Sequence, residues 1–201
     1  MQDPPGGHPP ELRAVIDEAH RLRRRVAGHG YGGEGVDVAL DAGIDSIEHG
    51  ALLSSAQLER MAAQGTFLVL TTSAVAESDP RIPARIRAMM AEANAQYHDT
   101  IRRALEAGVQ LALGSDCVHG RNDREMLLLA RLGASPKFAL EAATANAAAL
   151  IQRDDLGHIR PGGAADFLFA AGDPLQEPAV LSFPQAVMQA GVWLRPPPVA
   201  A

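Results

Sequence analysis

The feature that most constrains the fold is an alternation of short apolar segments with longer helical patterns. Four apolar segments have the length and the β-branched character of buried strands. They lie at residues 26–29, 44–48, 66–71 and 109–113. The helical patterns between them end at glycines, such as Gly43, Gly65 and Gly108, which favour a helix C-cap. Strands that alternate with helices pair in parallel through right-handed crossovers, so the sequence predicts an α/β fold.

Four βα units fit half of a closed barrel better than an open sheet. Polar side chains recur at the C-terminal ends of these strands, which is where an α/β barrel carries its chemistry. The chain has 201 residues, fewer than the ~250 of a complete eight-stranded barrel. We therefore predict a partial TIM (β/α)8 barrel of about four βα units over residues 1–156. Glycine-rich and proline-rich β segments predict a small C-terminal β appendage over 157–195 and a disordered tail over 196–201.

Composition argues against several classes of partner. The net charge of −6 does not favour a nucleic-acid backbone or an anionic membrane surface. No apolar run approaches the ~20 residues of a membrane-spanning helix. Cys117 is the only cysteine, so an internal disulfide cannot form, and we expect a reducing, cytoplasmic location.

Three residues at predicted strand ends are of the types that bind divalent metals. His29 and His49 end two successive strands, 20 positions apart, and Asp116 follows the fourth strand. Two imidazoles and one carboxylate favour zinc over magnesium, and a bound ion would activate water. Two other roles suit the Asp116 side chain, namely proton transfer during catalysis and the N-cap of a following helix. The alternative is three unrelated polar residues, but their recurrence at strand ends favours a metal site.

Other polar residues near these strand ends are weaker candidates. Tyr31 and His119 would contact a substrate at the barrel mouth. Thr71 and Thr72 are expected behind the ligands, as their supports. Glu48 precedes His49 on a strand and should point to the opposite face, where we expect it to contact a neighbouring helix or loop.

Several segments resemble the second half of the metal-dependent amidohydrolases, nearest to the imidazolonepropionase-like and Xaa-Pro dipeptidase-like group. The segments are GHGYGGEGVDVALDAGIDSIEHG, LALGSDC, EAATANAAALI and LGHIRPGGAADFLFAAGDPL. The resemblance implies that His29 and His49 are metal ligands ending the fifth and sixth barrel strands. It also implies that Asp116 ends the eighth strand, binds metal, and shuttles a proton while hydroxide attacks an amide-type C–N bond.

The chain departs from the family pattern in its other ligands. The HxH pair of the first strand is absent, and the only lysine, Lys137, is not placed to be the bridging carboxylated lysine. Tyr31 stands where relatives often have a second histidine, and PGGAAD replaces PGKxAD. The resemblance therefore implies one half of a site that holds one or two ions in complete relatives. His29 and His49 would hold one ion, and Asp116 would belong mainly to the other.

Two functions remain open from the sequence. The first is a metal-dependent hydrolase of small amide, cyclic amide or dipeptide-like substrates, active as part of a longer enzyme. The second is a non-catalytic half-barrel that needs a partner N-terminal half. A half-barrel exposes two sheet edges, so we expect self-association, pairing with a separately encoded half, or an incomplete gene product, and we favour the last.

Overall fold

A parallel four-stranded sheet forms the centre of the chain. The computed structural model describes residues 9–72, 83–116 and 122–198 of the 201. The strands are β1 (Ala27–Gly30), β2 (Ser46–His49), β3 (Phe67–Leu70) and β4 (Leu111–Leu113). They pair in parallel in the order β1-β2-β3-β4, which matches their order in the sequence. Successive βα units of a barrel have this arrangement, and the predicted parallel pairing is confirmed.

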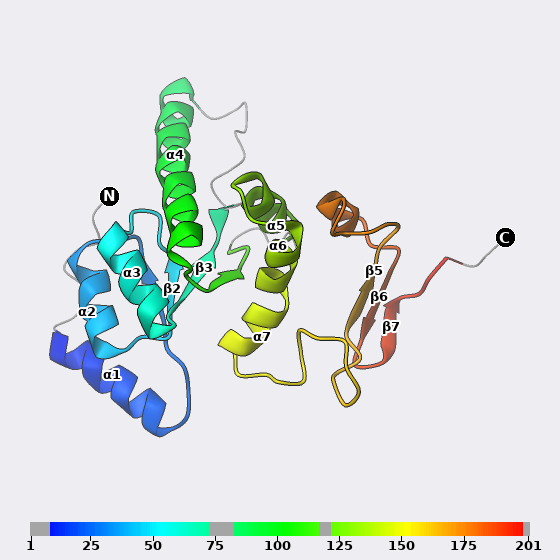
Figure 1. The fold of residues 1–201 in the computed structure, drawn as a ribbon, viewed down its shortest axis with the longest axis horizontal. Helices are drawn as coiled ribbons and strands as arrows, with labels where there is room; N and C mark the ends of the chain where they lie inside the picture. The colour runs from blue at the N-terminus through cyan, green and yellow to red at the C-terminus, as the bar shows by residue number, and fades with distance from the viewer. Residues whose placement is uncertain (1–8, 73–82, 117–121, 199–201) are drawn as a thin grey trace.

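Helices connect and follow the strands, as Figure 1 shows. They are α1 (Pro9–Arg21), α2 (Glu34–Ala42), α3 (Ser55–Gln64), α4 (Ala84–Ala107), α5 (Asn122–Arg131), α6 (Pro136–Ala143) and α7 (Ala145–Leu150). The alanine-rich pattern of residues 136–151 predicts a single helix, and this prediction is wrong, because Thr144 separates α6 from α7. Thr144 leaves the helical backbone region, with φ −128° and ψ −85°, and its hydroxyl donates to the Leu140 carbonyl at 2.7 Å. Within the described residues no helix is both long and apolar enough to cross a membrane.

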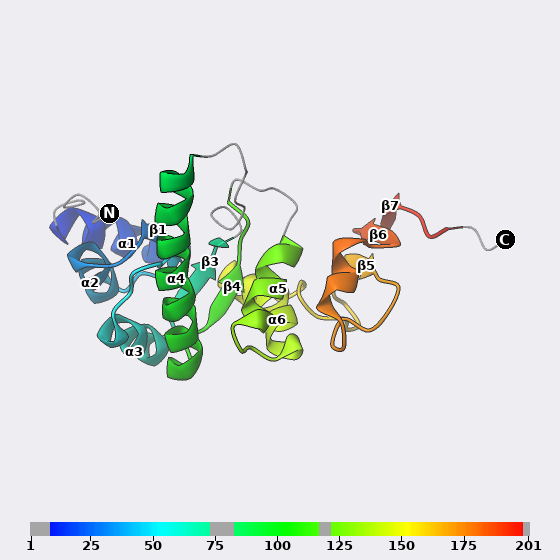
Figure 2. The same cartoon turned by 90° about the horizontal axis from the view of Figure 1, so that it is seen from above.

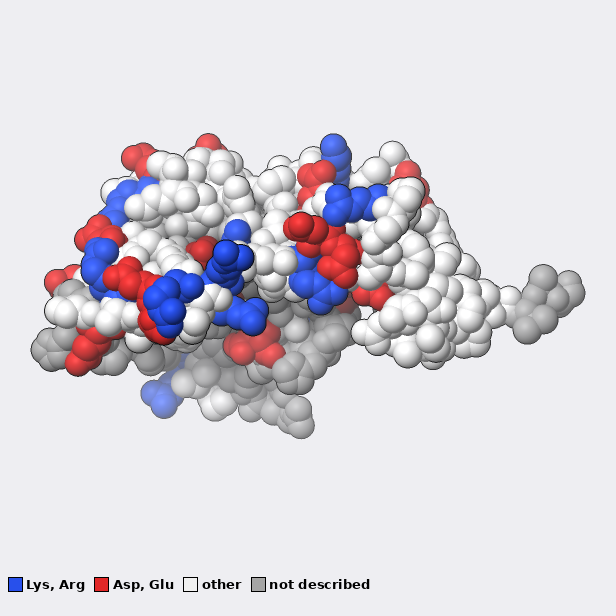
Figure 3. Space-filling model, turned by 90° about the horizontal axis from the view of Figure 1, so that it is seen from below, with Lys and Arg blue, Asp and Glu red and all other residues white. Residues whose placement is uncertain are grey.

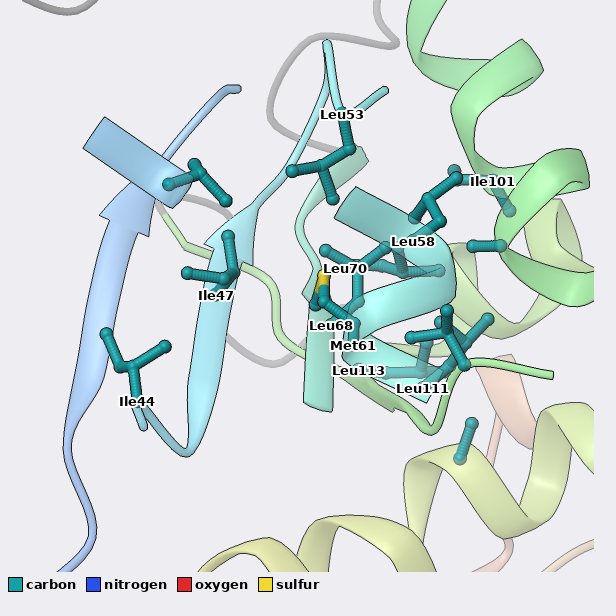
Figure 4. Close-up of a cluster of buried hydrophobic side chains, with 14 of the residues drawn as sticks. Ile44, Ile47, Leu53, Leu58, Met61, Leu68, Leu70, Ile101, Leu111 and Leu113 are labelled. Carbon is teal, nitrogen blue, oxygen red and sulfur yellow. The ribbon is translucent and has the colours of Figure 1, made fainter. Parts of the chain in front are cut away.

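The main core lies between the sheet and its helices. Alternate strand residues, among them Ile47, Leu68 and Leu111, are buried against Leu58 and Met61 of α3 and against other core side chains. Figure 4 shows these side chains between the strands and α3, with Ile101 of α4 beside them. The other sheet face carries a smaller cluster.

That smaller cluster consists of Phe67, Val69 and Ala112, and residues Ala147 and Leu150 of α7 pack against it. Both faces of the central strands are therefore covered by apolar side chains. This explains why β3 and β4 are apolar along their whole length rather than alternating.

A second, antiparallel sheet follows the barrel units. Its strands are β5 (Phe167–Phe169), β6 (Ala186–Gln189) and β7 (Val192–Arg195), and η2 (Pro178–Ser182) lies in the connection between β5 and β6. Leu181 of η2 packs against the main core, and η2 contacts α5. Figures 1 and 2 show this sheet at one end of the molecule, beyond α5 and α6.

Candidate active site

The parallel register of β1 and β2 brings the two predicted histidine ligands together. His29 pairs with Glu48, and Gly30 pairs with His49, so both histidines lie at the same end of the sheet. Their ring centroids are 4.5 Å apart, with an angle of 67° between the ring planes. The His29 side chain is exposed and His49 is partly buried. The spacing of one βα unit therefore produces the expected juxtaposition.

Tyr31 joins the two imidazoles at the strand ends. Its ring centroid lies 5.0 Å from that of His29 in an edge-on arrangement, and 5.5 Å from that of His49 in a stacked arrangement. The hydroxyl of a tyrosine can donate a hydrogen bond while its ring packs against neighbours. The tyrosine is therefore placed at the barrel mouth, as predicted.

His49 stands at a sharp change of chain direction. Its φ is +72°, in the left-handed region that few non-glycine residues adopt, and φ of Gly50 is +66°. A Cβ atom on Gly50 would collide with Leu68 Cδ1 and would lie 2.8 Å from Leu53 Cδ1. Glycine is required here because the chain turns in direct contact with the core.

Thr71, just beyond β3, fixes the His49 ring from behind. The Nδ1 atom of His49 lies 2.5 Å from Oγ1 of Thr71, and Thr71 is only 7% exposed. Metal-binding imidazoles commonly use one ring nitrogen for such a supporting hydrogen bond and the other for the ion. The expectation that Thr71 lies behind the ligands agrees with this contact.

A cavity of about 310 Å³ opens beside His49 and Tyr31. Residues from β1, β2, β3 and β4 ends reach it, including Tyr31, His49, Thr71 and Asp116. Helix α4 supplies the opposite wall with Ala93, Asn94, Gln96 and Tyr97. Sequence reasoning missed this wall, because helical periodicity alone does not tell which residues of α4 reach over the strand ends.

Asp116 follows β4 and lines the same cavity as His49. Its side chain is exposed, and its φ of +46° again lies in the left-handed region. Two of the three predicted ligands therefore occupy an unusual backbone conformation. Such conformations cluster at functional sites, where the surrounding fold maintains them.

The sequence predicts that Glu48 contacts a neighbouring helix or loop. The hydrogen bond that the structure shows for Glu48 lies instead within its own strand, where the carboxylate accepts from Ser46 Oγ at 2.8 Å. Its register neighbours are His29 and Val69, so its side chain shares the inner sheet face with them. Burial raises the pKa of this carboxyl group above its ordinary value, and the Ser46 hydrogen bond opposes that shift.

The predicted ligands meet some of the requirements of a divalent metal site. Two adjacent imidazoles suit an ion bound about 2 Å from each nitrogen. Across the described ranges, however, no three His, Cys, Asp or Glu side chains group closely enough to hold a metal. His119 and Cys117 lie outside the described residues. The ligand roles of His29, His49 and Asp116 therefore stay predictions.

These features define a partial α/β barrel with a histidine-lined cavity at the C-terminal ends of its strands. A model of the amidohydrolase family matches residues 2–194, and the chain belongs to that family. The resemblance found in the sequence is thus confirmed.

Curated relatives and solved structures agree with this assignment. Ochratoxinase of Aspergillus niger is 31% identical, over 92% of this chain and 40% of its own length. An imidazolonepropionase of Salinispora arenicola is 32% identical, over 78% of this chain and 38% of its own length. The crystal structure of a Xaa-Pro dipeptidase with bound methionine superposes with a TM-score of 0.86 at 34% identity, covering 97% of this chain and 50% of that one.

The chain spans about half the length, or less, of the curated relatives it matches. An uncharacterised protein of Mycobacterium tuberculosis, 35% identical, is matched over 90% of this chain but only 50% of its own length. The relatives with solved structures are likewise covered by about half. The partial barrel predicted from the sequence is thereby confirmed as the fold class.

Proposed function

We propose that this chain supplies half of the active site of a metal-dependent hydrolase that cleaves amide-type C–N bonds. The observation that carries the proposal is the pair of imidazoles, 4.5 Å apart, of which His49 lines one cavity together with Asp116. Membership in the amidohydrolase family supports the reaction class.

His29 and His49 would hold a divalent ion, for which two imidazoles favour zinc. In complete relatives we expect one or two ions, with Asp116 mainly at the second. When bound, the metal would supply a water molecule of lowered pKa at the site. The Thr71 hydroxyl keeps Nδ1 of His49 occupied, so Nε2 would be the nitrogen that binds the ion.

Other residues at the cavity would handle the substrate. Asp116 would accept a proton at its carboxylate and return it to the leaving nitrogen, the usual role of a positioned general base and acid. Tyr31 would donate a hydrogen bond from its phenol to the substrate, since its ring packs directly on both imidazoles. His119, three positions after Asp116 in the sequence, would be a second substrate contact.

The cavity and the relatives support one class of substrate. A cavity of about 310 Å³ is at the lower end of the range for small-molecule sites. The relatives include an ochratoxinase, an imidazolonepropionase and a Xaa-Pro dipeptidase. We propose a small amide, cyclic amide or dipeptide-like substrate.

A second candidate function is a non-catalytic half-barrel that requires a partner. The absence of a three-ligand metal group among the described residues favours this alternative. So do the outer strands of the parallel sheet, since β1 and β4 each have one hydrogen-bonded neighbour in the described part of the chain. The partner would be an N-terminal half that supplies further ligands.

Hydrolysis assays separate the two functions. The chain is incubated with zinc and with N-acyl amino acids or dipeptides, alone and with the N-terminal half of a 35%-identical relative. The proposed hydrolase predicts activity in at least the mixture, with loss in His49→Asn and Asp116→Asn. Hydrolysis by the chain alone would exclude the non-catalytic function, whereas inactivity of both samples with no zinc bound would contradict the hydrolase.

A further inference from the structure

A buried network of hydrogen bonds lies behind His49. Thr71 and Thr72 follow β3 directly and are 7% and 1% exposed. The backbone N–H of Thr71 donates to the hydroxyl oxygen of Tyr97 at 3.2 Å. The hydroxyl of Thr72 donates to Oε2 of Glu125. The end of β3 is therefore tied to two different helices.

Tyr97 and Glu125 reach this point from α4 and α5, at sequence separations of 26 and 53 residues from their partners. Tyr97 is 4% exposed, and Glu125 is 1% exposed. Burying a carboxyl group is costly unless its hydrogen-bonding capacity is used. A buried glutamate on a helix that packs outside the site therefore indicates a specific task for its contact with Thr72.

The hydroxyl of Thr71 is oriented by this network. The backbone N–H of Thr71 donates to the hydroxyl oxygen of Tyr97, and Oγ1 of Thr71 lies 2.5 Å from Nδ1 of His49. A threonine hydroxyl can donate one proton or accept one. Because the network holds Thr71 in place, its hydroxyl takes one of these roles toward Nδ1, and that role requires one tautomer of the His49 ring.

We propose that Tyr97 and Glu125 are positioning residues that hold the His49 ring in one orientation and one tautomer through Thr71 and Thr72. This directs Nε2 away from the network. The use of Nε2 by a metal rests on the proposed function, but the selection of the tautomer does not.

The network also accounts for the backbone of His49. A non-glycine residue with positive φ persists where its surroundings over-determine its conformation. The contact between Nδ1 and Thr71 anchors the side chain while Gly50 turns the chain away. If Thr71 were free to move, Nδ1 would lose this hydrogen bond, and both tautomers of the ring would become accessible.

Two variants break the network without touching His49. Thr72→Val removes the hydroxyl that reaches Glu125, and Tyr97→Phe removes the oxygen that accepts from the Thr71 backbone N–H. Thr72→Ser restores the hydroxyl. The matched control is Thr66→Val at the opposite end of β3, because Thr66 is 3% exposed and donates to the Ile44 carbonyl at 3.2 Å.

The readout is the tautomer of His49, measured by nitrogen-detected NMR of the metal-free 201-residue chain at about pH 8, where an ordinary imidazole is neutral. We expect a single tautomer in the wild type, Thr72→Ser and Thr66→Val. In Thr72→Val and Tyr97→Phe the ring-nitrogen signals of the second tautomer should appear. Identical spectra in Thr72→Val, Tyr97→Phe and Thr66→Val would overturn the proposal, and so would a wild type in which both tautomers are populated.

Zinc affinity gives a second readout and separates this inference from the proposed function. Loss of a supporting hydrogen bond should lower affinity by about 10-fold in Thr72→Val and Tyr97→Phe relative to Thr66→Val. Equal affinity in all three would refute the positioning role. If the wild type binds no zinc, the proposed function fails, and the tautomer measurement alone decides on the network.

Discussion

At the scale of single residues, the unusual feature is the left-handed backbone of His49 and Asp116. Their φ values are +72° and +46°, and both line one cavity. The left-handed region costs most non-glycine residues roughly 1–2 kcal/mol, but asparagine less. The residue types and strand-end positions of both sites were predictable from sequence, whereas these dihedral angles were not, because they depend on tertiary contacts.

This conformation predicts a difference between two substitutions of His49. His49→Asn should be more stable than His49→Ala by about 0.5–1 kcal/mol, since asparagine tolerates positive φ. Denaturant unfolding measures the difference. His29 is the control, because it is not among the described residues with positive φ. If His29→Asn is more stable than His29→Ala by the same margin, the backbone conformation of His49 is not the cause of the difference.

Tyr97 predicts how stability depends on alkaline pH. Burial raises the pKa of its phenol above the ordinary value of 10.0. The folded state therefore keeps the proton where the unfolded state loses it, and stability falls as pH rises from about 10 toward the raised pKa. Tyr97→Phe should be about 1–3 kcal/mol less stable at neutral pH, because it leaves the buried Thr71 N–H without an acceptor.

The difference in unfolding free energy between the wild type and Tyr97→Phe should shrink above pH 10. The wild type loses stability there as Tyr97 ionises, whereas the variant has no phenol to ionise at this position. Urea unfolding curves at several pH values follow the change. A deficit that is constant or grows with pH would show that Tyr97 is not the titrating group.

At the scale of secondary-structure elements, the strands and helices were largely predictable, but their contacts were not. The helical pattern predicts a helix over about 84–107 that ends at Gly108, and α4 has these bounds. The break at Thr144 was missed in an alanine-rich run that favours a continuous helix. The juxtaposition of His29 and His49 followed from regular βα spacing, whereas the reach of Tyr97 and Glu125 across the sheet depends on packing that periodicity does not encode.

The turn after β2 predicts an effect of Gly50→Ala. The new methyl group would enter the core beside Leu68 and Leu53, and the alanine would have to keep the positive φ of Gly50. Overpacking lowers the free energy of unfolding by about 1–3 kcal/mol, in addition to the loss caused by the positive φ of a non-glycine residue. Gly65→Ala is the control, because its φ is +73° and no heavy atom of the surroundings lies within 4 Å of the point where the new methyl carbon would sit. Equal losses of unfolding free energy in the two variants would refute the crowding at Gly50.

At the scale of the whole molecule, the second sheet is notable for its exposed apolar side chains. Phe169 and Trp193, with ring centroids 5.4 Å apart, are each 42% exposed. Leu168 and Leu194 are 50% and 64% exposed. In the view of Figure 3, charged side chains gather over the barrel units and are sparse over the end that holds β5 to β7. Apolar surface of this kind favours association.

We therefore expect the isolated chain to self-associate through this sheet. Sedimentation velocity should show species larger than the 21.2 kDa monomer at micromolar concentration. Leu194→Lys should shift the distribution toward monomer. Val15→Lys is the control, because Val15 is 59% exposed on α1, away from the second sheet. A wild-type monomer, or equal effects of both variants, would contradict the prediction.

The central claim is that His29 and His49 form one half of a metal site. The most direct test is a zinc titration of the histidine-labelled chain, followed by the ring signals in NMR. We expect His29 and His49 to respond together and to saturate with one ion, while His20, His98 and His158 do not follow them. A titration in which His29 and His49 stay unchanged, or respond separately, would contradict their assignment as ligands of one ion.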